Sequence, residues 1–425
     1  MAADQPTTRS HRRLTPRAKS KSGKPGGSLR KGALQGILVP AFREASGLGV
    51  VARTAARAGC QLLLVCSGRI TAREAVTSVR GFEPDVPVLA IDLPPHHQLP
   101  GFRVDLPQPT RWNWASRHDA HRKRNLGLLV ARQLGWERAL LLNDDICGFD
   151  EAQLAATVRP LLSDPVRACG WAFDDFPDNS VVCHANRLAG GEQSTSIGDG
   201  ALALRLGSDT AFFPPVYNED WLFLFDHVCR EEVALAEAPA GNEVRQDRYD
   251  PFADPQRAAA EEFGDVLAEG LFALLHQCST MENAIREARS VAFWKNQLRE
   301  RQALLEAIDM RLAAGHLPAG IYGAGAEFRP VTPPPALVKR VRLRLQEARL
   351  QHTSEWPELL VKFVRAWRSA HGRWEELLDR TWAHGDVDLA LDTVGLDPTS
   401  AVRAGDWTPR GPAFCEALER TPSSA

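Results

Sequence analysis

The sequence predicts an α/β fold with a mainly parallel sheet, followed by an α-helical C-terminal domain. Three apolar strands alternate with helical stretches between residues 35 and 91, two aspartates follow a later apolar strand, and long charged amphipathic segments begin near residue 255. Strands that are apolar along their whole length, instead of alternating with polar residues, are typical of parallel sheets covered by helices on both faces.

Length and composition agree with a globular protein that contains more than one part. At 425 residues the chain exceeds the usual size of one domain, so we expect a catalytic core with an appended helical region. Hydrophobic residues make up 44% and charged residues 24% of the sequence, which excludes a fibrous protein or a chain disordered throughout. The longest apolar runs, such as residues 139–142 and 222–225, are too short to cross a bilayer, and no membrane span is expected.

The first 34 residues are predicted to be a disordered basic tail. Residues 1–31 contain many Lys and Arg residues and almost no acids, a composition that favours a solvated leader over a segment that binds nucleic acid or anionic lipid. The tail lacks the apolar core of a secretory signal. The eight cysteines are scattered singly without a C-x-x-C pair, so a cytoplasmic location is expected.

The first part of the chain shows a βαβαβ alternation. Pro40 ends the first apolar run, and the turn Ser67-Gly68 ends the second. Crossovers between parallel strands in such a unit should be right-handed. We expect strands at 35–39, 61–66 and 86–91, with helices between them at 49–58 and 71–79.

A third helix and a fourth strand lead to the acidic segment. Residues 116–134 place an apolar stripe opposite a basic face, as in an amphipathic helix that ends at Gly135. Residues 138–142 then form an apolar strand, directly followed by Asn143, Asp144 and Asp145. Ligands of open α/β sheets bind at the carboxyl ends of the strands, so we expect the functional site here.

The remaining elements divide the chain into a sheet domain at 35–252 and a helical domain at 253–425. Residues 190–200 are rich in Gly, Ser and Thr and are expected to form a mobile loop near the site. Further helices and strands are expected at 151–162, 168–173, 201–206 and 218–232, and long helical segments at 258–275, 281–314 and 334–380.

Asp144 and Asp145 are candidates for holding a divalent cation. Such a cation neutralises a diphosphate leaving group, and one or two carboxylates suffice to bind it. The structural alternative is that these aspartates only cap the next turn or helix.

Two other segments could complete such a site. Arg124 and Asn125 lie one short connection before the acidic strand end and could contact a nucleotide, although a solvated basic helix face is the alternative. Glu219 and Asp220 stand at a predicted helix start, where a carboxylate could deprotonate an acceptor hydroxyl. Their structural alternative is charge complementing the helix dipole.

Weaker candidates lie nearby in sequence. Asp199 stands between Gly198 and Gly200, which allow close backbone approach to a ligand, although the same pattern suits an ordinary turn. His227 could be a further metal ligand or base, but a lone helical histidine is more often a packed or surface residue. Residues 246–252 could close over a donor, or could connect the two domains.

Five of these segments, in this order, resemble motifs of GT-A fold glycosyltransferases, particularly the family 2 type. The resemblance covers roughly residues 35–250. The segments are Val39-Pro40-Ala41-Phe42-Arg43-Glu44, Leu64-Val65-Cys66-Ser67-Gly68, Arg124-Asn125-Leu126-Gly127, Leu141-Leu142-Asn143-Asp144-Asp145 and Asn218-Glu219-Asp220-Trp221.

The resemblance implies a metal-dependent enzyme that transfers a sugar from a nucleotide-diphosphate sugar to a small-molecule or glycan hydroxyl acceptor. Mn²⁺ or Mg²⁺ would be held by Asp145 and Asn143, with His227 as a further ligand, and Asp220 with Glu219 would be the catalytic base. Asp199 and Gly200 would lie on the acceptor side. The residues implied in donor binding are Pro40, Ala41, Arg43, Glu44, Ser67, Arg124, Asn125 and Asp144.

One departure from the family pattern concerns the metal. Asn143 replaces the first aspartate of the DxD motif, which removes a carboxylate but leaves an amide oxygen that can accept. A nucleotidyltransferase is the rival enzyme, but it would need a Gly-rich basic loop where this chain has residues 40–44. A non-catalytic nucleotide-sugar-binding or scaffold protein is the other alternative, and Asn143 supports it. Nucleic acid is not an expected partner.

Overall fold

The computed structural model describes most of the chain from residue 32 onward. The described residues are 32–44, 47–109, 114, 118–172, 179–191, 197–236, 244–278, 280–315, 334–405 and 407. Of the basic tail predicted at residues 1–34, residues 1–31 lie outside them, whereas Ala33 and Leu34 are described and buried in the core. Residues 192–196 of the predicted loop also lie outside the described residues.

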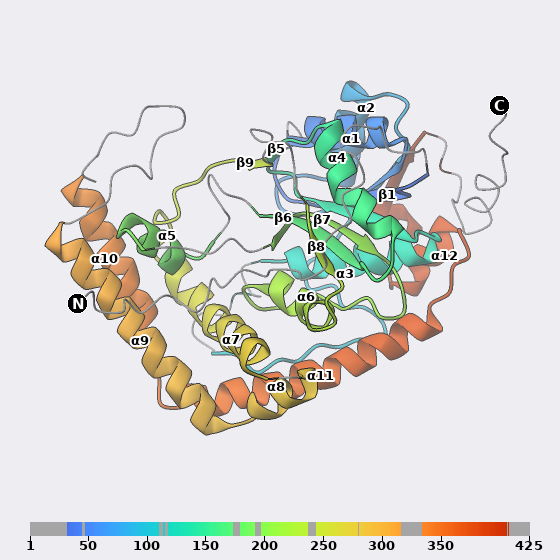
Figure 1. Cartoon of the computed structure of the whole chain (residues 1–425). Helices are drawn as coiled ribbons and strands as arrows, with labels where there is room; N and C mark the ends of the chain where they lie inside the picture. The colour runs from blue at the N-terminus through green and yellow to red at the C-terminus, as the bar shows by residue number, and fades with distance from the viewer. Residues whose placement is uncertain are drawn as a thin grey trace, which may run out of the picture.

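An eight-stranded sheet in the order β10-β3-β2-β1-β4-β7-β6-β8 forms the centre of the molecule (Figure 1). β1 pairs in parallel with β2 and β4, and β2 with β3, whereas β7 runs antiparallel to both β4 and β6. The predicted α/β class with a mainly parallel sheet is therefore confirmed. The strands are β1 (Gly36–Ala41), β2 (Gln61–Cys66), β3 (Val88–Asp92), β4 (Arg138–Leu142), β6 (Ala168–Ala172), β7 (Ile197–Arg205), β8 (Val233–Leu235) and β10 (Ala401–Ala404).

The central strands are apolar throughout because helices cover both faces of the sheet. In β1, Ile37 and Val39 face one hydrophobic cluster, whereas Leu38 between them faces another. The first cluster includes residues of α1 (Leu48–Ala58), α2 (Ala72–Phe82) and α4 (Glu151–Val158). The second includes residues of α3 (Ala120–Gln133) and α6 (Glu219–Cys229), and Figure 1 shows the two sets of helices on opposite sides of the sheet.

The C-terminal region is mostly helical, as the amphipathic segments predicted. Each of the two longest predicted segments is divided in two, because Ser290 caps the start of α9 and residues 350–355 separate α10 from α11. α10 packs against α7 and α9. The helices are α7 (Arg257–Gln277), α8 (Met281–Glu287), α9 (Val291–Ala314), α10 (Pro335–Arg349), α11 (Trp356–Arg380) and α12 (Val387–Thr393).

The chain returns to the sheet after α12. β10 adds an antiparallel edge strand to β3, a feature that the sequence did not predict because the segment Ala-Val-Arg-Ala is short and only weakly apolar. The cluster on the α3 side of the sheet also contains Trp367 and Trp374 of α11, so the helical region and the sheet share one core. The boundary at residue 252 stays a prediction. Of the residues described, none belongs to a helix that is long and apolar enough to cross a membrane.

A buried ionic cluster fastens α9 to α7. Arg301 donates to Glu262 and Asp265 at 2.7 Å and to Glu269 at 2.6 Å, and its side chain is only 2% exposed. Burial alone would lower the pKa of Arg301, but Glu262, Glu269 and Asp265 together raise it well above its usual value. His352, in the connection after α10, also contacts Glu262 at 2.8 Å. The guanidinium is therefore needed to keep two buried acids, Glu262 and Asp265, beside the partly buried Glu269.

Replacing Arg301 by Met should destabilise the protein by about 3–5 kcal/mol, because it leaves uncompensated buried carboxylates. The midpoint of urea unfolding, followed by circular dichroism, measures the effect. The matched control is Arg342→Met, which breaks the half-exposed pair with Asp309 and should cost about 1 kcal/mol or less. Equal small effects of the two substitutions would show that the cluster does not stabilise the fold.

Candidate functional site

A cavity of about 890 Å³ opens at the carboxyl ends of β1 and β4. Its walls come from the segments after these two strands, the start of β7, the starts of α6 and α7, and the segment after β9 (Arg245–Gln246). Nine residues predicted for the site line it, from five separate parts of the chain: Arg43, Glu44, Arg124, Asn143, Asp144, Asp145, Gly200, Glu219 and Asp220.

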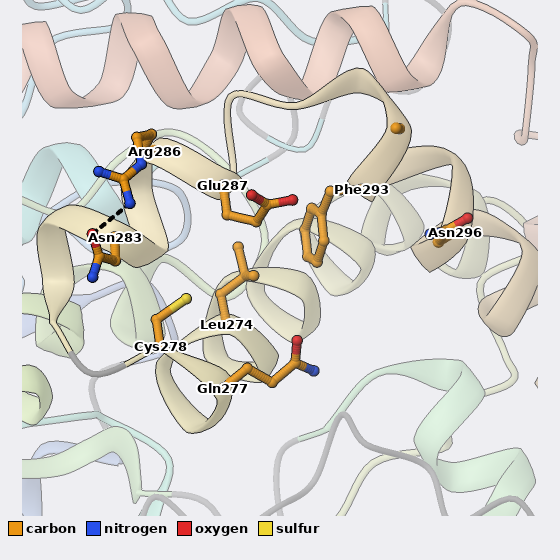
Figure 2. Close-up of a pocket in the computed structure, with 9 residues that line it drawn as sticks. Leu274, Gln277, Cys278, Asn283, Arg286, Glu287, Phe293 and Asn296 are labelled. Atoms are coloured by element: carbon orange, nitrogen blue, oxygen red, sulfur yellow. Dashed lines mark hydrogen bonds between the residues drawn. The ribbon is translucent and has the colours of Figure 1, made fainter.

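A second cavity, of about 650 Å³, lies between the end of α7, α8 and the start of α9 (Figure 2). Figure 2 shows Arg286 directed at Asn283, to which it donates a hydrogen bond of 2.6 Å. Glu287 is the one carboxylate among the described residues lining this cavity. The described lining of this second cavity therefore lacks the paired carboxylates that a divalent cation would need.

Asp145 and Asp247 are brought side by side although they lie far apart in the sequence. β5 (Ile146–Gly148) pairs with β9, and the backbone N–H of Asp247 donates to the carbonyl of Asp145 at 2.8 Å. Arg43 bridges the two carboxylates, at 2.8 Å from Asp247 and 3.4 Å from Asp145. Gln246 donates to the Asp145 carboxylate at 2.8 Å. Two carboxylates and one cationic group thus meet at one point of the cavity wall.

Cys147 adds a thiol to the Asp247 side of this pair. Its Sγ donates to Asp247 Oδ1 at 2.8 Å. Partial burial and this hydrogen bond raise the pKa of Cys147 to about 11, so the thiol keeps its proton at neutral pH. Cys147 therefore orients the Asp247 carboxylate without adding a negative charge.

Asp144 is bound to the segment that follows β1. Its Oδ2 accepts from the backbone N–H groups of Phe42 and Arg43, both at 2.7 Å. Gly47 lies against the same region, and a Cβ there would come within 2.7 Å of the Asp144 carbonyl oxygen. The carboxylate was predicted to bind the donor; in the structure it lines the cavity and orders the 42–43 backbone.

Arg124, Asn143 and Glu219 form one contact group. Arg124 pairs with Glu219 at 3.0 Å and donates to the side-chain oxygen of Asn143 at 3.3 Å. That oxygen accepts from a guanidinium in the structure, and the predicted role of Asn143 as a metal ligand stays a prediction. Glu219 is largely buried and paired with Arg124, whose position it supports; its predicted part in the catalytic base stays a prediction.

The start of α6 presents Asp220 to the cavity. Asn218 precedes it in the left-handed conformation, with φ of 61°, which asparagine tolerates better than most residues. Asn218 donates to Asp265 of the buried ionic cluster at 3.0 Å. Gly264 of α7 packs so closely on this segment that a Cβ would lie 2.3 Å from the Tyr217 carbonyl oxygen. The helical region thus fixes the backbone that carries Asp220.

Three residues predicted to bind the donor make contacts within the protein, and their donor-binding role stays a prediction. Pro40 and Ala41 belong to β1, which is buried throughout, and the Ala41 carbonyl accepts from Lys123 at 2.7 Å. Ser67 donates to Asp119 at 2.6 Å. None of the three is among the described residues that line the cavity.

Asn125 also has a structural role and not the predicted contact with a nucleotide. It is buried, and its side chain makes two hydrogen bonds of 2.8 Å with the backbone N–H and carbonyl of Phe213. Both ends of the amide are used in this contact, which fastens α3 to the segment before α6.

His227 lies at the other edge of the sheet, so it does not share a metal site with Asp145. β7 runs antiparallel to β4, and its last residue, Arg205, pairs with Arg138 at the edge opposite Asn143. His227 lies there with Asp209 and Glu232, one ligand atom of each lying within 4.8 Å of the others. Its imidazole contacts Glu232 at 2.8 Å. His227 is therefore a packed histidine, the alternative that the sequence also allowed.

The predicted acceptor-side residues are only partly described. Gly200 lines the cavity, and its carbonyl accepts from the N–H of Asn143 at 3.0 Å. The backbone of Asp199 belongs to β7, but its side chain lies outside the described residues.

Several cavity residues were not among the predicted site residues. Asp247 and Tyr249 come from the 246–252 segment, which the sequence predicts either to close over a donor or to connect the two domains. Buried Phe252 fits a connector, whereas the two polar residues line the cavity. Arg257 donates to the Tyr249 hydroxyl at 2.9 Å, and its guanidinium lies 4.4 Å from the ring. Trp114 also lines the wall. Aromatic residues without a regular spacing give no signal that would find them from sequence.

The described lining of the cavity is strongly acidic. Four arginines, at positions 43, 69, 124 and 257, stand against a larger set of carboxylates. Such a wall attracts a divalent cation and repels a bare diphosphate. The eight carboxylate residues are Glu44, Asp144, Asp145, Glu219, Asp220, Asp247, Asp250 and Asp254.

No protein-family model and no curated protein matches the sequence. Two solved structures of glucosyl-3-phosphoglycerate synthase from Mycobacterium tuberculosis resemble the fold, one in complex with Mn²⁺, uridine-diphosphate-glucose and phosphoglyceric acid, the other with Mn²⁺, uridine-diphosphate and phosphoglyceric acid. Both are 14% identical to this chain with a TM-score of 0.36, and the matches cover 56% and 59% of this chain and 80% of each of theirs. At this TM-score the likeness supports no inference about the site.

A double-mutant cycle tests the pairing of Arg124 with Glu219. Arg124→Met and Glu219→Gln should each destabilise the protein, and together they should do so less than additively. The expected coupling is about 1–3 kcal/mol, because the pair is largely buried. Urea unfolding of the four proteins measures it. Additive effects would mean that Glu219 is available for another role, including the predicted one of base.

Proposed function

We propose that the protein is a glycosyltransferase that moves a sugar from a nucleotide-diphosphate sugar to a hydroxyl acceptor with the help of a divalent cation. The observation that supports this most is the meeting of Asp145, Asp247 and Asp220 in one cavity at the carboxyl ends of β1 and β4. Ligands of open α/β sheets bind at this edge. The resemblance of five ordered segments to family 2 GT-A enzymes points to the same reaction.

Asp145 and Asp247 are the residues that fit a cation. Their carboxylates are adjacent, and a positively charged side chain, that of Arg43, already lies between them. Oxygen ligands of this kind suit both Mn²⁺ and Mg²⁺. When bound, such a cation would stabilise the negative charge that grows on the diphosphate as the sugar leaves.

Asp220 is the proposed catalytic base. It stands at the first turn of α6 on the cavity wall, where it would take the proton of the acceptor hydroxyl in an inverting reaction. Its Oδ1 accepts from the backbone N–H of Trp221 at 2.9 Å, which orients the carboxylate. Glu219 beside it would keep Arg124 directed toward Asn143 at the donor end of the cavity.

The segment after β1 does not favour the nucleotidyltransferase alternative. Such an enzyme would use free backbone N–H groups after its first strand to hold phosphates. The N–H groups of Phe42 and Arg43 are instead bound to Asp144. Gripping phosphates there would require breaking two short hydrogen bonds.

Ligand-induced stabilisation should distinguish the candidate functions. UDP-glucose or GDP-mannose should raise the melting temperature when Mn²⁺ is present and much less in EDTA, and a ligand at about 100 times its Kd should add about 2.7 kcal/mol of stability. Differential scanning fluorimetry measures the shift. No effect of any nucleotide would favour a scaffold, and a preference for nucleoside triphosphates would favour the nucleotidyltransferase.

Two isosteric substitutions should separate binding from chemistry. Asp220→Asn should lower sugar transfer by about 10²–10⁴-fold while leaving Mn²⁺-dependent nucleotide-sugar binding intact, because it removes only the base. Asp145→Asn should weaken that binding as well. Release of nucleoside diphosphate and calorimetric titration provide the two readouts. Asp309→Asn, on the half-exposed side of α9, is the control, and full transfer by the Asp220 variant would refute the base.

A further inference from the structure

We infer that Arg43 is a resident cation of the metal site: it neutralises Asp145 and Asp247 before a divalent cation binds, and then moves to the diphosphate. This inference rests on the proposed function, because it requires both a cation and a phosphate-containing donor in the same cavity.

The two carboxylates are held together by contacts other than Arg43. The backbone hydrogen bond between Asp247 and Asp145 and the pairing of β5 with β9 set their spacing. Gln246 donates to Asp145, and Cys147 donates to Asp247. Both carboxylates would therefore keep their positions when the guanidinium leaves, so the site does not collapse.

Arg43 itself is anchored by its backbone and not by its head group. Its N–H is bound to Asp144 at 2.7 Å, but its side chain is 41% exposed and that of Asp247 is 56% exposed. An ion pair so open to water contributes about 1 kcal/mol or less, so the guanidinium can leave at little cost. The anchored backbone then keeps the side chain at the cavity wall.

Two other arginines that line the cavity are held more firmly by their partners. Arg124 is buried against Glu219, and Arg257 contacts Glu261 and Tyr249. Arg43 is thus the cationic side chain whose position directly opposes a metal ion between Asp145 and Asp247, because two positive charges cannot share that point without strong repulsion. A displaced guanidinium would meet diphosphate oxygens with the planar fork geometry that suits them.

If Arg43 has this role, replacing it should raise the affinity for Mn²⁺ and lower the affinity for UDP. Arg43→Gln should bind Mn²⁺ about three- to fivefold more tightly than the unaltered protein when no nucleotide is present, since a competing cation is gone. With saturating Mn²⁺, the same variant should bind UDP about tenfold more weakly, since a phosphate contact is gone. Electron paramagnetic resonance of free Mn²⁺ gives the first value, and calorimetry gives the second.

Two variants control for charge and for folding. Arg69→Gln removes a positive charge from the same cavity wall, so it should tighten Mn²⁺ by about twofold or less. Arg43→Lys keeps the positive charge, so the affinity for Mn²⁺ should stay near its original value. The same variant should still bind UDP more weakly, because lysine lacks the planar guanidinium that can donate two parallel hydrogen bonds to a phosphate. Melting temperatures would show that all three variants fold.

The outcomes separate the inference from the proposed function. If the unaltered protein binds Mn²⁺ and UDP but Arg43→Gln binds Mn²⁺ no more tightly than Arg69→Gln does, the resident cation is refuted and the glycosyltransferase stands. If Mn²⁺ binds none of the proteins, the proposed metal site fails and this inference fails with it. Weaker Mn²⁺ binding by Arg43→Gln would also refute the inference.

Discussion

Carboxylates gathered at one edge of a sheet repel one another, and the site depends on the donors that hold four of them in place. Backbone N–H groups bind Asp144, and Arg124 pairs with Glu219. Gln246 donates to Asp145, and Cys147 donates to Asp247. Each donor comes from a different segment than its carboxylate. The charge balance of the cavity therefore also fixes the relative positions of the loops after β1 and β4 and the start of α6.

The helical region is part of this arrangement because α7 supports the cavity from behind. Asp265 accepts from Asn218, just before Asp220, and is itself held by buried Arg301. Arg257 at the start of α7 reaches the cavity through Tyr249. A change in the packing of α7 against α9 would thus be felt at the proposed base, so the C-terminal helices contribute to the site as well as to the core.

Elements with a strong local signal could be predicted from sequence, whereas side-chain directions could not. Apolar runs located the parallel strands, and the strand end at Asp145 does lie at the cavity. Asn125 and His227 looked like site residues because a motif or a residue type does not tell which way a side chain points; one faces Phe213 and the other the opposite edge of the sheet. The sequence could not place Asp247 beside Asp145, because β9 has two residues and its pairing with β5 spans about a hundred positions.

The neighbours of Asn143 account for an amide at this position. Its side-chain oxygen accepts from Arg124, whose other nitrogen is paired with Glu219. An aspartate at this position would compete with Glu219 for the same guanidinium and would add a fourth negative charge beside Asp144, Asp145 and Glu219. A neutral amide keeps the hydrogen bond without that repulsion. The first position of the DxD-like segment can therefore lack a carboxylate without loss to the proposed cation site, because Asp247, from a distant segment, supplies the second one next to Asp145.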